Sequence, residues 1–265
     1  MSQTSWIYRF EATASCCILC NEKPLFSNLE SLQEEFMRKL STAFGTMNKE
    51  RYKWFYDHVQ SRYYNLMIKW ILLPFGGEAK WRRRMIERVS FRAGEKILEM
   101  CCGTGGATLY ISEKAKDKGE IIGVDLSSGQ LSRAKERTYF CPTHFIEGDV
   151  TRTVCDDNSF DKVFVTHAIH EMPRELRLKT LREARRVVKQ DGEVVVLELD
   201  NPPNLFLRLL IGFWFFYWLP GNFETPTRRD MFKHGLVNEA KEAGLTNVRK
   251  YSAYKGIFQT VIAAK

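Results

Sequence analysis

The chain has 265 residues, a length that suits one large domain or two small ones. Hydrophobic residues make up 44% and charged residues 27%, as in an ordinary globular protein, so the composition excludes a chain that is disordered throughout. The formal net charge of +8 permits a nucleic acid or an anionic membrane as a partner but selects neither. Because no stretch of 18 residues is free of charged and polar side chains, we expect no membrane-spanning helix.

The seven cysteines favour a reducing compartment, and we predict a cytoplasmic protein. Their number is odd, two pairs are adjacent in sequence, and no secretory leader precedes them. Cys17 and Cys20 form a CxxC, but zinc needs about four ligands and no second CxxC or histidine pair stands nearby. We therefore predict free thiols and no metal site.

Two segments are expected before the main domain. Residues 1–48 form an N-terminal extension of open role, in which residues 29–40 have the apolar spacing of a helix. Residues 49–92 form a helical cap, whose aromatic-rich first part ends at Pro74 and the glycines after it. For the basic run 80–92 we favour a solvated helix face over a patch that contacts phosphate.

From residue 93 to the C-terminus, short apolar strands alternate with helices. The predicted strands are 96–100, 120–125, 143–149, 161–167 and 193–199, and the predicted helices are 105–117, 127–137, 174–189 and 230–243. This alternation is typical of a parallel sheet covered on both faces. Two further strands, joined by a tight turn around Gly256, pair antiparallel. The prediction is an α/β, Rossmann-like domain over 93–265, with a seven-stranded, mostly parallel sheet and an antiparallel C-terminal hairpin.

The insert 201–227 interrupts this alternation. Thirteen of the fifteen residues from Leu205 to Leu219 are apolar, and Arg208 lies among them. The run is shorter than the roughly 20 residues that cross a bilayer. Two interpretations stay open: a buried core helix, or a lid or interfacial segment that faces a lipophilic substrate or a membrane surface.

A glycine turn follows the first strand, where an open α/β sheet binds its ligand. It runs from Glu99 to Gly106. A dinucleotide site needs G-x-G-x-x-G, and Thr108 stands in place of the last glycine. A phosphate-binding loop of the Walker type needs a lysine, and none follows.

S-adenosyl-L-methionine (SAM) fits the pattern better, because three acids stand at successive strand ends. They are Glu99, Asp125 and Asp149. A carboxylate after the second strand can accept both ribose hydroxyls, and one after the third can accept the adenine amino hydrogen. SAM has no phosphate, so the turn needs no cation.

Several motifs extend this pattern beyond the acids. They are ILEMCCGTGG, GVDLS, EGDV, FDKVFVTHAIH and VVKQDGEVVVLEL, with Tyr63-Tyr64-Asn65 and PFGGEAKWRRR upstream. With these motifs the stretch 96–265 resembles the class I SAM-dependent methyltransferases, and in particular the ubiquinone/menaquinone biosynthesis C-methyltransferases. The loop after the fourth strand departs from the quinone enzymes, so the resemblance fixes the cofactor better than the substrate.

The resemblance implies a set of cofactor-binding residues. Those that would cradle the methionine part are Glu99, Cys101, Gly103 and Gly105. Those that would hold the ribose and adenine are Asp125, Leu126, Asp149 and Val150. Thr166 would lie by the sulfonium, and Tyr63 would close over the cofactor from the N-terminal helices.

The acceptor should meet the methyl group after the fourth strand, beside His167, His170 and Glu171. One of these side chains could take a proton from the acceptor; the alternative is that Glu171 simply begins a helix. We predict methyl transfer from SAM to a lipophilic small molecule, first a prenylated quinol. A lipid head group or another small metabolite is the alternative, and a nucleic acid is disfavoured by the apolar insert. Peripheral contact with the inner membrane face and a homodimer stay open.

Overall fold

The computed structural model describes residues 49–116, 119–218 and 225–265. The CxxC of Cys17 and Cys20 and the helix expected at 29–40 lie outside the described residues, as does the rest of the segment 1–48. The domain boundaries proposed after residues 48 and 92 stay predictions.

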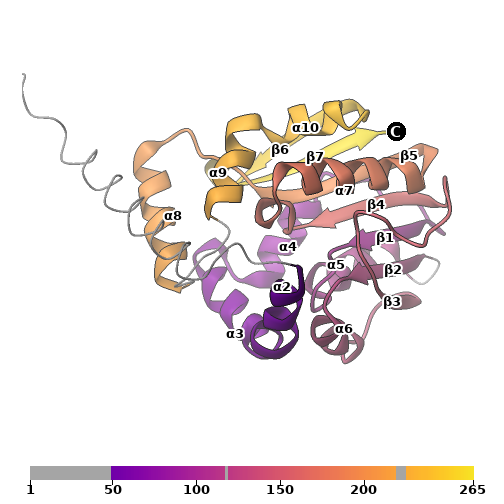
Figure 1. Ribbon diagram of the computed structural model, residues 1–265, viewed down its shortest axis with the longest axis horizontal. Coiled ribbons are helices and arrows are strands. Elements are labelled where there is room, and N and C mark those ends of the chain that lie inside the picture. Colours follow the sequence, from indigo (N-terminus) through magenta and orange to yellow (C-terminus); the bar gives the residue numbers. More distant parts are fainter. Residues whose placement is uncertain (1–48, 117–118, 219–224) are drawn as a thin grey trace, which may run out of the picture. The chain divides into compact units, whose positions relative to one another are not determined.

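Seven strands form one sheet in the order β3-β2-β1-β4-β5-β7-β6 (Figure 1). Strands β1 to β5 are parallel to one another, whereas β7 is antiparallel to both β5 and β6. The strands are β1 Lys96–Met100, β2 Glu120–Asp125, β3 Thr143–Glu147, β4 Phe160–Thr166, β5 Val188–Leu199, β6 Thr246–Ala253 and β7 Phe258–Ala264. The predicted Rossmann-like sheet with its C-terminal hairpin is confirmed.

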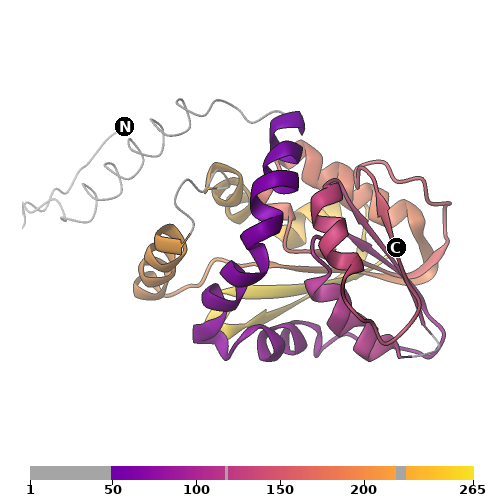
Figure 2. The same ribbon diagram turned by 90° about the horizontal axis from the view of Figure 1, so that it is seen from below.

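The described helices cover both faces of this sheet. They are α2 Lys49–Phe55, α3 Ser61–Ile71, α4 Glu78–Ile86, α5 Gly106–Ala115, α6 Ser128–Lys135, α7 Arg174–Val187, α8 Leu205–Trp218, α9 Thr225–His234 and α10 Leu236–Glu242. Single turns are η1 Tyr56–Gln60, a π-helical turn, and the 3-10 turns η2 Leu73–Phe75, η3 Ile169–Glu171 and η4 Tyr254–Gly256. Figure 2 shows α2, η1 and α3 running on as one long rod.

Each inner strand buries both of its faces, which explains why these strands are apolar without interruption. In β1, Leu98 and Met100 belong to the core under α7 and α10, whereas Ile97 belongs to the core under α4 and α5. The side chains of a strand alternate between its two faces, so one short run of residues supplies both cores. The carboxyl ends of the parallel strands are thereby fixed along one edge.

Two predicted elements differ from those observed. The single helix expected at 230–243 is two helices, because Gly235 has a φ of 79° and lies in the left-handed region, which ends α9 and starts α10 in a new direction. The fifth strand begins at Val188, which pairs with Phe160, and the register then shifts so that Glu193 pairs with Lys162. The predicted turn at Asp191-Gly192 lies in this irregular part of β5.

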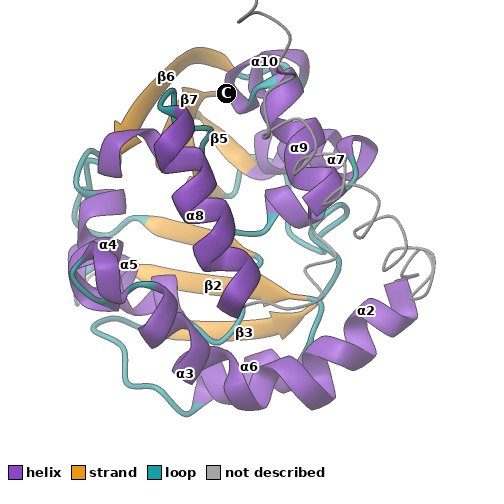
Figure 3. Cartoon of the chain, turned by 90° about the vertical axis from the view of Figure 1, so that its left-hand side faces the viewer, coloured by secondary structure: helices purple, strands orange, loops and turns teal. Residues whose placement is uncertain are grey.

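The apolar insert forms helix α8, which Figure 3 shows across the near side of the molecule. Leu207 and Ile211 pack on the core under α4 and α5, but a second group of apolar side chains is exposed. The exposed group is Leu205, Phe206, Leu209, Leu210 and Phe213. The interpretation as a buried core helix therefore holds for one face of α8 only, and the exposed group does not fit it. None of the helices in the described ranges combines the length and apolarity of a bilayer-crossing helix.

Candidate active site

A cavity of about 340 Å³ lies at the carboxyl ends of the parallel strands. Its floor comes from the segments that follow β1, β2, β3 and β4, and the helices α2 to α4 supply further wall. The lining includes Cys101–Thr104, Asp125–Ser127, Gly148–Thr151, Thr166–Ala168, Glu171–Pro173, Lys53, Tyr56, Tyr64 and Arg82. Strand ends are where doubly wound sheets bind ligands, so the fold and the cavity agree.

The glycine turn after β1 is sharp and closely packed. Cys101, Gly103 and Gly105 all have positive φ values. Gly103 lines the cavity, whereas Gly105 lies behind it, where a Cβ would fall 2.1 Å from the hydroxyl oxygen of Tyr139. Burial raises the pKa of the Cys101 thiol well above its usual range, so the thiol stays protonated and is a packing group in this turn.

Asp125 and Asp149 both reach the cavity with oxygens already oriented by the backbone. The two oxygens of Asp125 accept hydrogen bonds from the backbone N–H groups of Gly103 (2.8 Å) and Ser127 (2.9 Å). Asp149 accepts from the backbone and hydroxyl of Thr151. A carboxylate oxygen has a second lone pair, so each acid can still accept hydrogen bonds from a ligand.

Glu99 lies beneath the cavity floor and does not line it. Its side chain is fully buried and accepts hydrogen bonds from the hydroxyls of Thr108 and Thr166, the latter at 2.8 Å. Burial raises the pKa of Glu99 to about 7, although both threonines and the charge of Arg82 lower it. Thr166 does line the cavity, so it connects this buried acid to the ligand space.

The structure brings most of the predicted cofactor residues together. Those that line the cavity are Cys101, Gly103, Asp125, Leu126, Asp149, Val150 and Thr166. It does not bring Tyr63 there: that side chain is 64% exposed, and its neighbour Tyr64 lines the wall. Consecutive residues of a helix point about 100° apart, so a shift of one position moves a side chain to another face.

Of the three residues predicted to act on the acceptor, two line the cavity and one does not. His167 and Glu171 line the cavity. His170 is buried away from it, with Nδ1 2.7 Å from the carboxylate of Glu198. Glu171 accepts a hydrogen bond of 2.7 Å from the hydroxyl of Tyr56, a cavity residue that the sequence did not single out.

His167 is held in an unusual conformation at the end of β4. Its φ is 49°, which is rare for a residue other than glycine, and its ring packs 4.6 Å from that of Trp81. Nε2 is buried and has no hydrogen-bond partner in the described part of the chain. Burial, with the charges of Arg82 and His170, lowers the pKa of His167 well below its usual range, so the imidazole is neutral at pH 7.

Helix α4 contributes a cavity residue from a run that we interpreted as solvated. Lys80, Arg83, Arg84, Arg88 and Arg92 are indeed exposed, but Arg82 is buried at 6% exposure and lines the cavity. The buried positions of α4 include Met85 and Ile86, which lie three and four residues after Arg82 and share its face. A single arginine on an otherwise apolar face was the signal that could have found it.

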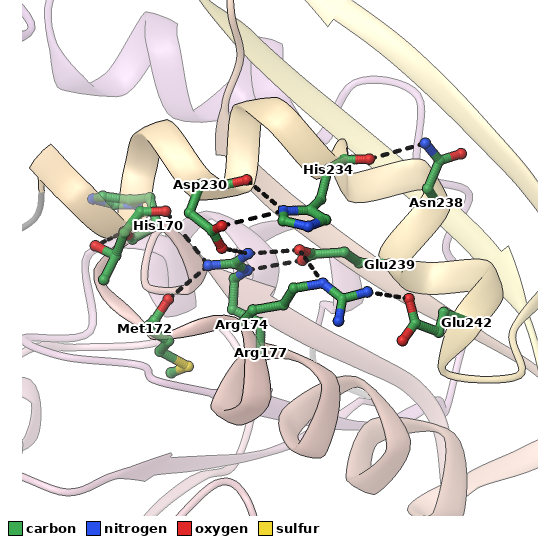
Figure 4. Close-up of polar contacts among 10 residues, drawn as sticks. His170, Met172, Arg174, Arg177, Asp230, His234, Asn238, Glu239 and Glu242 are labelled. Carbon is green, nitrogen blue, oxygen red and sulfur yellow. Dashed lines mark hydrogen bonds and ion pairs between the residues drawn. The ribbon is translucent and has the colours of Figure 1, made fainter.

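One group of residues outside the cavity has the proximity of a metal site. Asp230, His234 and Glu239 bring ligand atoms within 4.8 Å of one another. Figure 4 shows that Arg177 lies among them, and its guanidinium is 2.7 Å from Asp230 and 2.6 Å from Glu239. Arg177 also donates to the backbone carbonyl of Met172 on the cavity wall. The cluster is therefore an ion-pair network that ties α9 and α10 to the cavity.

The comparisons with known proteins agree with this geometry. A model of the ubiE/COQ5 methyltransferase family matches residues 45–224, well over half of the chain. The chain belongs to this family. The demethylmenaquinone methyltransferase of Staphylococcus aureus (strain JH9) is 28% identical over 229 residues, which cover 81% of this chain and 93% of the relative.

Two solved structures share the fold at low identity. A SAM-dependent methyltransferase from Aquifex aeolicus has a TM-score of 0.51 and 18% identity, covering 69% of this chain and 88% of that one. Phosphoethanolamine N-methyltransferase 2 from Haemonchus contortus, in complex with SAM, has a TM-score of 0.54 and 17% identity, covering 80% and 59%. This protein is a SAM-dependent methyltransferase, and the two acids oriented at the ends of β2 and β3 suit a cofactor rich in hydroxyl and amino donors.

Proposed function

We propose that this methyltransferase acts on a lipophilic small molecule, a prenylated quinol, at the surface of a membrane. The relative named above as a demethylmenaquinone methyltransferase supports a quinol acceptor. The observation that carries the lipophilic character is the exposed apolar surface of α3 and α8. We call it the apolar surface and define it as Tyr63, Leu66, Trp70 and Leu73 on α3 and η2, with Leu205, Phe206, Leu209, Leu210 and Phe213 on α8.

The proposal places SAM along the floor of the cavity. Asp125 accepts hydrogen bonds from the ribose hydroxyls, and Asp149 accepts one from the adenine amino group. Leu126 and Val150 line the cavity beside these acids and suit the adenine ring. The methionine part then reaches the glycine turn at Cys101 and Gly103, with Thr166 by the sulfonium. Tyr64, in place of Tyr63, covers the cofactor from α3.

When bound, SAM supplies an electrophilic methyl group, and the protein mainly has to align the acceptor with it. A quinol ring carbon becomes nucleophilic when a neighbouring hydroxyl loses its proton, and the ring carbon loses its own proton after the methyl group has been added. We propose Glu171, held by Tyr56, as the group that takes the hydroxyl proton. His167 is neutral, and because its Nε2 is buried, we propose that its ring shapes the cavity wall and does not hydrogen-bond the acceptor. We propose no contact between His170 and the acceptor, because the hydrogen bond to Glu198 holds His170 away from the cavity.

The charges beside the apolar surface favour an anionic membrane as its partner. Helices α3 and α8 contain no aspartate or glutamate, whereas Arg62, Lys69 and Arg208 are exposed on them. Phe206 and Phe213 are 73% and 69% exposed, and the aromatic and aliphatic side chains together suit insertion at the head-group boundary. Each cation near such a surface contributes about 1 kcal/mol. We therefore propose a peripheral protein on the cytoplasmic face of the membrane.

Vesicle assays test the acceptor and the membrane together. Reduced demethylmenaquinone is offered with SAM in vesicles of phosphatidylcholine with and without phosphatidylglycerol, and as a short-chain analogue in solution. We expect faster methylation in the anionic vesicles. The double variant Phe206→Ser/Phe213→Ser should lower the rate on the vesicle-borne quinol at least about threefold, should spare the short-chain analogue, and should leave cofactor affinity unchanged.

The matched control replaces Val154, which is 87% exposed and lies outside α3 and α8. Val154→Ser should change neither rate. Equal loss on both acceptors in the double variant would contradict the membrane proposal. In vesicles that also contain phosphatidylethanolamine, methylation of its amino group with the quinol unchanged would contradict the quinol proposal.

A further inference from the structure

Arg82 is a buried cation whose ion pair is weak. Its Nε and Nη2 lie 3.4 and 3.5 Å from a single oxygen of Glu78, which is beyond a good hydrogen bond. Its Nη1 donates no hydrogen bond to any residue in the described ranges. A buried charge is costly unless its geometry and hydrogen bonding are good. The guanidinium thus has N–H groups available for further hydrogen bonds on the wall of the cavity. An anion bound there would give this buried charge better hydrogen bonds than Glu78 does.

The guanidinium lies against the start of α5. A Cβ at Gly106 would fall 2.8 Å from Nη2, so a side chain there would displace the arginine. The N-terminus of a helix carries partial positive charge and presents unpaired backbone N–H groups. Arg82 also lowers the pKa of both Glu99 and His167, which lie at the ends of β1 and β4. This corner of the cavity therefore favours a negative group.

The order of the strands indicates which negative group reaches this corner. Asp149 follows β3, Asp125 ends β2, the glycine turn follows β1, and Thr166 ends β4, which is also the spatial order of the strands. A cofactor with its adenine at β3 and its ribose at β2 extends its methionine part toward β1 and β4. The methionine part carries one carboxylate, and it arrives beside Arg82.

We propose that Arg82 binds the α-carboxylate of the methionine part of SAM. Arginine suits this group because its planar fork donates two parallel hydrogen bonds to a carboxylate, which lysine cannot do. An ionised hydroxyl of the acceptor has similar chemistry, and the experiment below distinguishes the two sources. The inference rests on the cofactor and not on the quinol, so its failure would leave the proposed acceptor standing.

Calorimetry with two ligands and the full chain tests the contact without any acceptor. The ligands are S-adenosylhomocysteine and its decarboxylated analogue, which keeps the amino group and the thioether. Arg82→Gln should weaken binding of S-adenosylhomocysteine about ten- to a hundredfold, the range for hydrogen bonds to a charged group, and should change binding of the analogue less than about threefold. Arg84→Gln is the control, because Arg84 is exposed on the same helix.

Arg82→Lys provides a second variant if the glutamine variant does not fold. It keeps the charge but not the fork, so we expect an intermediate loss that is again confined to the ligand with the carboxylate. Equal loss for both ligands would assign Arg82 a structural role and overturn the proposal. Unchanged affinity for S-adenosylhomocysteine with a raised KM for the acceptor would overturn it in favour of the acceptor hydroxyl.

Discussion

Replacement of Glu99 by glutamine should change how the stability of the protein depends on pH. Burial raises the pKa of this carboxyl from 4.5 to about 7, against the hydrogen bonds from Thr108 and Thr166 and the charge of Arg82. The folded state therefore holds the proton more tightly than the unfolded state does. As a consequence, the free energy of unfolding of the natural protein falls as the pH rises from about 4.5 to about 7.

The size of the effect follows from the shift. One pKa unit corresponds to about 1.4 kcal/mol, so the natural protein should lose about 2.5 kcal/mol of stability between pH 5 and pH 8 through Glu99 alone. Glutamine does not ionise and still offers one oxygen to a threonine, so it loses about 1 kcal/mol at every pH. Glu99→Gln should therefore match the natural protein at about pH 5 and exceed its stability by about 2 kcal/mol at about pH 8.

Urea unfolding followed by tryptophan fluorescence at the two pH values measures this difference. Glu136→Gln is the control variant, because the side chain of Glu136 is exposed. If the stability difference between Glu99→Gln and the natural protein is the same at both pH values, the raised pKa of Glu99 is not its cause.

The stability that the natural protein loses when Glu99 ionises should be regained on cofactor binding, because the ionised carboxylate lies under the cavity. Glu99→Gln should thus weaken SAM, which carries the sulfonium charge, more than S-adenosylhomocysteine.

Three further predictions concern cofactor binding and are read by calorimetry with S-adenosylhomocysteine. Asp125→Ala should weaken binding by about 1.5–3 kcal/mol through lost ribose contacts, and unchanged affinity in a folded variant would contradict that role. Tyr64→Ala should weaken binding at least about threefold, whereas Tyr63→Ala should not, since only Tyr64 lines the cavity. A chain that starts at Met47 should fold and bind as the full chain does; loss of binding in that folded chain would assign the N-terminal segment to the site.

The strand ends could be predicted from the sequence because their signals are local. Asp125 and Asp149 each follow a short apolar run, and parallel strands bring such positions to one edge whatever the long-range packing. Ser127 obeys a similarly local rule: serine is a favoured residue at a helix N-cap, and its hydroxyl accepts a hydrogen bond from the backbone N–H of Gln130 at the start of α6. Local rules therefore predict the part of the cavity that we propose for the nucleoside.

The cavity wall formed by α3 and α4 and the exposure of α8 depend on packing that local sequence patterns do not encode. Aromatic and aliphatic residues occur on every side of α3, so the apolar spacing in the sequence did not indicate whether Tyr63 or Tyr64 faces the cavity. Arg82 stands in a run of basic residues, and only the packing of α4 distinguishes it from its exposed neighbours. The apolar composition of α8 is compatible with a core and with a surface, and burial alone decides between them.

Transfer of a trideuterated methyl group from labelled SAM into a lipid extract tests whether the protein methylates a prenylated quinol. The full chain is incubated with the labelled cofactor and extracted lipids under reducing conditions, and the products are analysed by mass spectrometry with fragmentation. We predict that the label appears on a ring carbon of a prenylated quinol and that this labelling is lost in the Glu171→Gln variant. Label found only on head-group amines or on water-soluble metabolites would contradict it.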